Sequence, residues 1–179
     1  MDTTASYNNV ITYCKDLFLK KTKDYGTAWR IMRPSSITDQ LYIKAQRIRT
    51  LEIKKVSKVG EGILDEYVAI VNYCVIAIMQ LEIPEEDGEN LDFDRVDQLY
   101  TEKVNETRDL MLAKNHDYGE AWRDMRISSL TDLILMKLHR VKQIEDNQGQ
   151  TLVSEGLKAN YQDMLNYAVF ALIKSGLAQ

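Results

Sequence analysis

The sequence has little of what a β-rich or an extended protein needs. Among its 179 residues are eight glycines and two prolines, which excludes a collagen-like or proline-rich chain and leaves few sharp turns. All-β sandwiches normally use more of both residues between their strands. With 45% hydrophobic and 28% charged residues, the chain has the composition of a folded globular protein with a hydrophobic core.

Cysteine, an excess of positive charge and long apolar runs are also scarce. The two cysteines, Cys14 and Cys74, have no metal-binding spacing, so we expect reduced, buried thiols. The net charge of −4 does not indicate a nucleic-acid-binding surface. The apolar runs fall short of the roughly 20 residues of a membrane span, and the N-terminal residues lack a secretion-signal pattern. These features predict a cytoplasmic protein without a membrane partner.

One long internal repeat dominates the sequence. Residues 24–39 and 117–132 are identical at 12 of 16 aligned positions, at an offset of 93 residues. Weaker matches extend this similarity, so that each repeat spans about 75 residues. Between the repeats, residues 84–94 open with proline and include six acidic residues, which predicts an exposed linker. We therefore assign the first repeat to residues 1–83, the linker to 84–95 and the second repeat to 96–179.

The pattern of apolar residues predicts three helices in each repeat. The first two helices show helical spacing of apolar residues, and a strongly apolar third helix is expected over residues 61–81 and again over 155–172. The glycine after Asp-Tyr predicts the end of each first helix. A Ser-Ser-x-Thr-Asp stretch, rich in N-cap residues, opens each second helix. Because one repeat has a marginal core by itself, we expect an all-α, MazG-like protein whose two repeats pack as one pseudo-twofold helical bundle.

The most strongly repeated block reads Lys-x-x-Asp-Tyr-Gly-x-Ala-Trp-Arg-x-Met-Arg. Its cations suit phosphate groups, and its aromatic rings can stack on a base. We therefore predict that a nucleotide is bound by Lys21, Tyr25, Trp29, Arg30 and Arg33 of the first copy and by their counterparts in the second, Lys114, Tyr118, Trp122, Arg123 and Arg126. The aspartates of the block, Asp24 and Asp117, are candidate catalytic residues that would hold a metal ion or activate a water molecule.

Polar residues also interrupt the apolar third helix of each repeat. Asn72 and Asn166 match one another, whereas Glu66 and Asp163 each occur in one copy only. A carboxylate and an amide on an interior helix face can hold Mg²⁺ together with waters and phosphate oxygens. On this interpretation Glu66 and Asp163 are metal ligands, Asp163 is also catalytic, and both asparagines contact the substrate.

A purely structural interpretation explains the same residues. The tryptophans would fill the space between helices, and Arg30 and Arg33 would pair with nearby aspartates. The Ser-Ser-x-Thr-Asp stretch would be only a helix cap. The carboxylates of the third helix would pair with basic residues of the second helix, namely Lys44, Arg47, Lys137 or Arg140. However, the two copies retain the polar positions of the block better than the apolar helical positions, which favours a role beyond packing.

The repeated Lys-x-x-Asp-Tyr-Gly-x-Ala-Trp block and the Asn-Tyr pairs at 72–73 and 166–167 resemble the bacterial and phage family called nucleotide modification-associated domain, type one. The resemblance covers nearly the whole chain twice and implies a part in nucleotide or modified-base metabolism. It also implies a distant likeness to the all-α MazG and dimeric dUTPase pyrophosphohydrolases, which hold Mg²⁺ with Glu-x-x-Glu and Glu-x-x-Asp on successive helices. This chain departs from that pattern, because Lys-x-x-Arg stands at 44–47 and 137–140.

The sequence thus predicts a protein whose partner is a small-molecule nucleotide or modified nucleotide. Whether it also hydrolyses that nucleotide with Mg²⁺, as a pyrophosphohydrolase does, is left open. The alternative is a non-catalytic helical scaffold or accessory protein of a nucleic-acid modification system. The oligomeric state, a homodimer included, is left open as well.

Overall fold

A computed structural model describes residues 2–60 and 62–177, and within these ranges it contains helices and no β-strand. The first repeat forms α1 (Thr3–Tyr25), η1 (Ala28–Ile31), α2 (Pro34–Lys54) and α3 (Ile63–Glu82), where η denotes a short 3-10 helix. After η2 (Glu85–Asp87), the second repeat forms α4 (Phe93–Tyr118), η3 (Ala121–Asp124), α5 (Ile127–Asp146) and α6 (Leu157–Lys174). The all-α prediction with three long helices in each repeat is confirmed.

Glycine ends the first helix of each repeat, as predicted. Gly26 and Gly119 follow α1 and α4 with φ of 67° and 60°, a region that glycine adopts at little cost. The second helices differ from expectation, because Arg33 and Arg126 occupy their N-cap positions and form no side-chain cap. Pro34 begins α2, a position that suits its fixed φ, so the Ser-Ser-x-Thr-Asp stretch lies inside the helix.

Two further boundaries bear on the predicted domain limits. α4 begins at Phe93, inside the segment 84–95 expected as a linker, because the Asp92 side chain accepts hydrogen bonds from two backbone amides of the first turn. The predicted start of the third helix, Glu61, lies outside the described residues, and α3 begins at Ile63.

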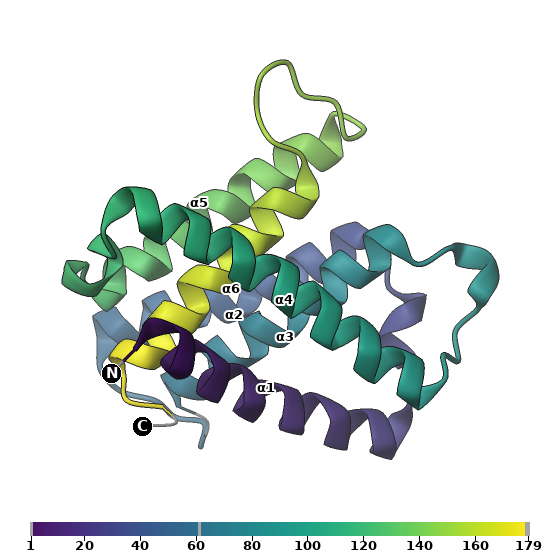
Figure 1. Cartoon of the computed structure of the whole chain (residues 1–179), viewed down its shortest axis with the longest axis horizontal. Helices are drawn as coiled ribbons and strands as arrows, with labels where there is room; N and C mark the ends of the chain where they lie inside the picture. The colour runs from purple at the N-terminus through teal and green to yellow at the C-terminus, as the bar shows by residue number, and fades with distance from the viewer. Residues whose placement is uncertain (1, 61, 178–179) are drawn as a thin grey trace.

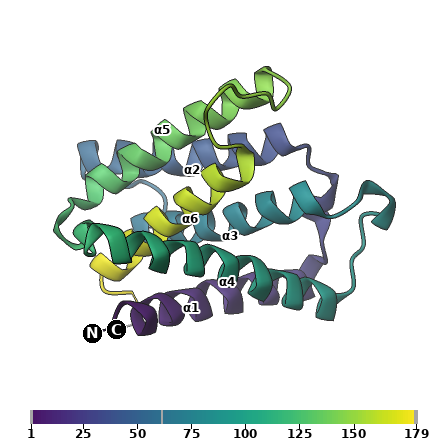
Figure 2. The same ribbon diagram turned by 45° about the horizontal axis from the view of Figure 1, so that its top comes forward.

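The helices lie in three layers, each made of matching helices from the two repeats (Figures 1 and 2). The middle layer is α3 with α6; α2 and α5 cover one side of it, and α1 and α4 cover the other. Because α3 packs along α6 and α2 along α5, the two repeats share one core. The pseudo-twofold, MazG-like packing stays a prediction.

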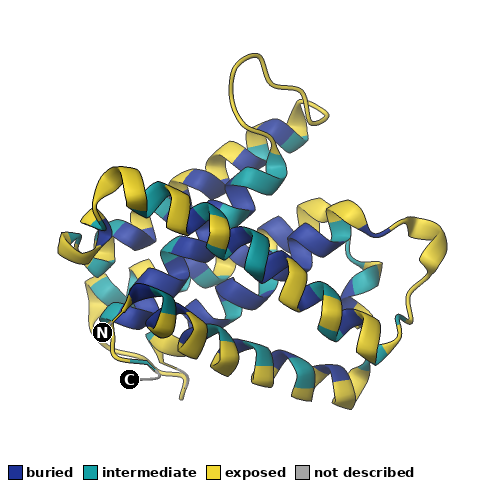
Figure 3. Ribbon diagram, viewed as in Figure 1, coloured by how far each residue is buried: buried dark blue, intermediate teal, exposed yellow. Residues whose placement is uncertain are grey.

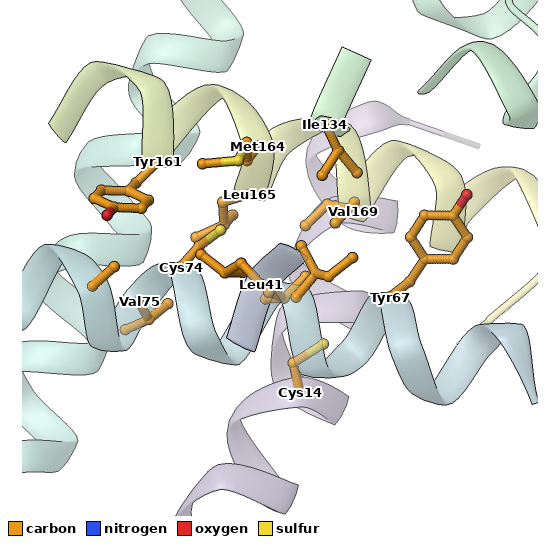
Figure 4. Close-up of a cluster of buried hydrophobic side chains, with 14 of the residues drawn as sticks. Cys14, Leu41, Tyr67, Cys74, Val75, Ile134, Tyr161, Met164, Leu165 and Val169 are labelled. Atoms are coloured by element: carbon orange, nitrogen blue, oxygen red, sulfur yellow. The ribbon is translucent and has the colours of Figure 1, made fainter. Parts of the chain in front are cut away.

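The middle layer carries more buried side chains than either outer layer (Figure 3). Tyr67 and Cys74 of α3 meet Val169 of α6 in a cluster that Leu41 and Cys14 complete from the outer layers (Figure 4). Both cysteines are free and buried, as predicted, and burial raises the pKa of each thiol. By length and composition α3 is apolar enough to cross a membrane, but 61% of its most apolar window is buried inside the fold.

A pair of buried asparagines joins the two repeats. The Asn72 amide of α3 donates to the Cys14 carbonyl at 3.1 Å and accepts from the Tyr100 hydroxyl of α4 at 2.7 Å. Its counterpart Asn166 donates to a carbonyl of α4 at 3.2 Å and accepts from the Tyr7 hydroxyl of α1 at 2.9 Å. Each asparagine therefore binds the first helix of its own repeat and a tyrosine of the other repeat.

A second buried set also crosses between the repeats. The hydroxyls of Tyr67 and Thr131 lie 2.6 Å apart, and Thr131 donates to the Glu52 carboxylate at 2.8 Å. The matching set consists of Tyr161, Thr38 and Glu145. In both sets the tyrosine and the glutamate come from one repeat and the threonine from the other. The threonine of the Ser-Ser-x-Thr-Asp stretch therefore links α2 and α5 to the middle layer.

Replacing one of these asparagines should destabilise the whole chain. Asn72→Ala leaves the Cys14 carbonyl and the Tyr100 hydroxyl without their buried partner, which should cost about 2 kcal/mol or more of unfolding free energy. Urea unfolding followed by circular dichroism measures this loss. The control is Asn147→Ala, whose exposed side chain donates only to a loop carbonyl and should cost no more than about 0.5 kcal/mol. Equal losses in both variants would contradict the cross-repeat role.

Candidate functional site

A cavity of about 610 Å³ lies in the first repeat, between α1, η1, α2 and α3. Its volume falls in the range of small-molecule sites, roughly 300–1,000 Å³. Its wall is mostly apolar and aromatic, but it also carries cations and a buried carboxylate. The side chains that matter for binding are Lys21, Tyr25, Trp29, Lys44, Glu66 and Tyr73.

The short helix η1 places Trp29 at this wall. The Gln80 side chain of α3 donates to the carbonyls of Arg30, at 3.2 Å, and Met32, at 3.0 Å, and so fixes η1 against the middle layer. Trp29 is only 8% exposed, and its Nε1 has no hydrogen-bond partner among the described residues. The ring therefore fills the space between helices, as the structural interpretation expected, and at the same time lines the cavity.

The cations of the cavity come from α1 and α2, and its two carboxylates, exposed Asp65 and buried Glu66, come from α3. Glu66 is buried; its Oε1 accepts from Arg47 at 2.8 Å, and its Oε2 lies 3.5 Å from the Lys44 ammonium without a hydrogen bond to any described residue. These are the pairs with the second helix that the structural interpretation predicted. Lys21 forms no ion pair with the residues that the structure describes. The wall thus offers a carboxylate oxygen, Oε2 of Glu66, that accepts no hydrogen bond, and one lysine, Lys21, that has no carboxylate partner among the described residues.

In the second repeat, a side chain of α6 occupies the place between the matching lysines. Asp163 aligns with Ala69, and its carboxylate accepts from Lys114 at 2.6 Å and pairs with Lys137 at 2.8 Å. Burial lowers the pKa of Lys114, but the hydrogen bond and charge of Asp163 outweigh burial, and the net direction is upward. Both carboxylate oxygens of Asp163 are therefore in use.

An aromatic side chain covers the tryptophan of the second repeat. Phe170 stacks on Trp122 with ring centroids 4.3 Å apart and planes inclined by 4°. The aligned residue of the first repeat is Ile76, which lines the cavity. At two aligned positions, therefore, the second repeat has side chains that contact its lysines and its tryptophan, where the first repeat has residues that line the cavity.

The comparison with known families agrees with this division of the chain. A family model described as nucleotide modification associated domain 1 matches residues 21–81 and again residues 114–174. The chain belongs to this family. Each matched range begins at a lysine of the site, Lys21 or Lys114, and includes the second lysine of its pair. Comparisons with curated proteins and with solved structures find no match.

In this member of the family, two of the predicted phosphate ligands have other partners. Arg30 donates to the linker carbonyls of Gly88 at 3.0 Å and Pro84 at 2.8 Å. Arg123 lies over the neighbouring tryptophan ring and donates to Glu120 at 2.8 Å. The structural interpretation expected Arg30 and Arg33 to pair with nearby aspartates, Asp24 and Asp39. Among the described residues neither pair forms, and Asp39 lies 3.4 Å from Lys142 instead. Arg30 holds the linker, and Arg123 holds the turn around η3.

The remaining predicted site residues divide between the surface and the core. Asn72 and Asn166 use their amides in the bonds between repeats, although Asn72 also borders the cavity. The others are exposed at helix ends: Asp24, Arg33, Asp117, Tyr118 and Arg126. None of these exposed residues belongs to the cavity wall.

The predicted magnesium ligands belong to different repeats, and cations surround each of them. Glu66 is paired with Arg47 and Lys44, and Asp163 with Lys114 and Lys137. Mg²⁺ prefers several carboxylate or water oxygens together, whereas neighbouring ammonium groups repel it. The described residues contain no group of three or more His, Cys, Asp or Glu side chains that could hold a metal ion. These donors therefore do not suit a Mg²⁺ ion held by the protein alone. The use of Mg²⁺ stays a prediction.

Sequence reasoning missed three residues as parts of a binding site. Lys44 and Tyr73 line the cavity and recur as Lys137 and Tyr167, so their retention was a signal that could have found them. Tyr13 also lines the cavity, but the second repeat has no aromatic residue at its position. Only the three-dimensional structure identifies Tyr13 as part of the cavity wall.

Removing the Arg30 side chain should loosen the linker rather than empty a phosphate site. Arg30→Ala deprives two linker carbonyls of a charged donor, which should cost about 1–3 kcal/mol of stability and speed cleavage by a glutamate-specific protease within residues 85–89. Limited proteolysis with mass spectrometry measures the cleavage rate. The exposed Arg33→Ala variant is the control and should be cleaved like the parent. Parent-like cleavage of Arg30→Ala would show that this contact does not hold the linker.

Proposed function

We propose that the protein binds a nucleoside phosphate, ordinary or modified, in the cavity of the first repeat. The observation that carries the proposal is that Lys21, Lys44 and the ring of Trp29 line one cavity of suitable size. Lysine is a common ligand of phosphate, and aromatic rings stack on bases of any identity. Membership of a family associated with nucleotide modification supports the same ligand class.

Each group of the wall has a part to play in this binding. The lysines neutralise phosphate oxygens, and Tyr25, which is 60% exposed, contributes a ring at the end of α1. The Oε2 of Glu66, which accepts no hydrogen bond although the Lys44 ammonium lies 3.5 Å away, accepts one from a sugar hydroxyl or a base amino group. A buried acceptor without a hydrogen bond carries a desolvation cost, and the ligand would relieve it.

Hydrolysis of the bound nucleotide is the second candidate. The observation that favours it is again Glu66, because a buried carboxylate beside a phosphate site can take a proton from an attacking water molecule. The predicted catalytic residues Asp24 and Asp117 are exposed and outside the cavity wall, so the proposal assigns them no step. The scaffold alternative requires neither binding nor turnover.

Removing the charge of Lys21 from the cavity wall should weaken nucleotide binding. In a buffer that contains Mg²⁺, ordinary and modified deoxynucleoside triphosphates are added one at a time and followed by phosphorus NMR and calorimetry. Lys21→Met keeps the aliphatic stem but removes the charge, and should raise Kd about tenfold or more, since a bond to a charged group contributes about 1.5–3 kcal/mol. Lys20→Met is the matched control, because Lys20 pairs with Asp16 outside the cavity and should leave Kd unchanged.

The same spectra separate the candidate functions. Line broadening without new signals indicates binding alone, and signals of monophosphate with pyrophosphate indicate hydrolysis. If no nucleotide broadens its signals or is consumed, the proposal is wrong and the scaffold alternative is favoured.

A further inference from the structure

The second repeat shows what kind of group suits the space between two of the retained lysines. There a carboxylate, that of Asp163, lies between Lys114 and Lys137 at 2.6 Å and 2.8 Å. In the first repeat both lysines are kept as Lys21 and Lys44 and line the cavity, but the aligned α3 residue is alanine. A methyl group stands where the second repeat has its carboxylate. Lys44 still has Glu66 at 3.5 Å, which is shared with Arg47, but Lys21 forms no ion pair among the described residues, so no carboxylate joins the first pair of lysines.

The tryptophans show the same contrast. The flat ring of Phe170 stacks on Trp122 at 4.3 Å, whereas the smaller, branched Ile76 stands at this position in the first repeat and lines the cavity beside Trp29. The second repeat therefore supplies from its own chain both an anionic group and a planar ring. At these two positions the first repeat has Ala69 and Ile76 instead, and both line its cavity.

We infer that the ligand of the first repeat takes the places that Asp163 and Phe170 fill in the second. Its acidic group lies between the ammonium groups of Lys21 and Lys44, beside Ala69, and its planar ring lies toward Trp29. The second repeat is filled by its own side chains and binds no ligand, so each chain binds one. This inference rests on the proposed function and specifies the ligand's geometry.

The spacing of the two internal groups limits the ligand class. Asp163 and Phe170 are seven residues apart on α6, which corresponds to about 10 Å along the helix axis. Ala69 and Ile76 have the same spacing on α3. A ligand that fills both places needs a spacer between its ring and its acidic group. A nucleoside phosphate has such a spacer in its sugar, whereas a free base lacks the acidic group and inorganic phosphate lacks the ring.

The second repeat allows a test of the anion site that does not depend on nucleotide binding. Asp163→Ala leaves two lysines around an empty space, which should lower Tm in chloride buffer. Replacing chloride by acetate or inorganic phosphate at equal ionic strength should then raise the Tm of this variant by at least about 2–4 °C more than that of the parent, through binding of the anion to the folded state. Asp97→Ala, which removes an exposed partner of Lys15, is the control for general salt effects and should respond like the parent.

The first repeat provides the complementary test. Ala69→Asp supplies the missing carboxylate and should weaken binding of the deoxynucleoside triphosphates at least tenfold, because its charge occupies both lysines. Ala69→Asn has the same size without the charge and should weaken binding less. Calorimetry should give one nucleotide per chain for the parent.

The outcomes distinguish this inference from the proposed function. If the parent binds no nucleotide, the proposed function fails, while the response of Asp163→Ala to acetate still decides whether the lysine pair is an anion site. If the parent binds nucleotide but Asp163→Ala responds to anions like the control, the inference is overturned and the function stands. Equal effects of Ala69→Asp and Ala69→Asn, or two nucleotides bound per parent chain, would also overturn it.

Discussion

The hydrogen bonds from Tyr100 to Asn72 and from Tyr7 to Asn166 tie the first helix of each repeat to the third helix of the other. A buried amide without partners is costly, so neither repeat can bury its third helix alone without losing one of these bonds. The threonines of α2 and α5 impose the same condition through the opposite tyrosine and glutamate. The middle layer is therefore a joint product of both repeats, and the other helices are placed by it.

Because the shared core holds the two repeats together, the sites of the two repeats can differ from each other. The lysines and the tryptophan of each repeat lie at matching places on the frame, because the same helices and the same short 3-10 helix carry them. One position on the third helix then decides whether a carboxylate lies between the lysines, and a second position decides whether a ring covers the tryptophan. The repeats differ at these two positions, while the bonds that hold the repeats together are present in both.

Much of the fold follows from the sequence, but the candidate site follows only in part. Helical periodicity, the glycines after Asp-Tyr and the apolar third helices predict the elements, because each is a local signal. α2 and α5 begin before the expected N-caps, at Pro34 and Ile127, and Asn72 and Asn166 have structural partners although they were predicted to contact substrate. Retention in two copies cannot separate a residue that binds a ligand from one that binds the other repeat, since both uses preserve polar groups. Ala69 and Ile76, which line the cavity, stand where the copies differ, and a search for residues shared by both copies overlooks such positions.

The unequal partners of the two lysine pairs lead to one further step of argument. Two ammonium groups that face the same space repel each other, and in the second repeat the carboxylate of Asp163 offsets that repulsion. In the first repeat Glu66 lies 3.5 Å from Lys44 and is shared with Arg47, and Lys21 has no ion pair among the described residues. Packing alone gives no reason to keep a second positive charge at this wall, because an apolar side chain would line it without repulsion. An anionic ligand gives that reason, since it would complete in the first repeat the arrangement that Asp163 completes in the second.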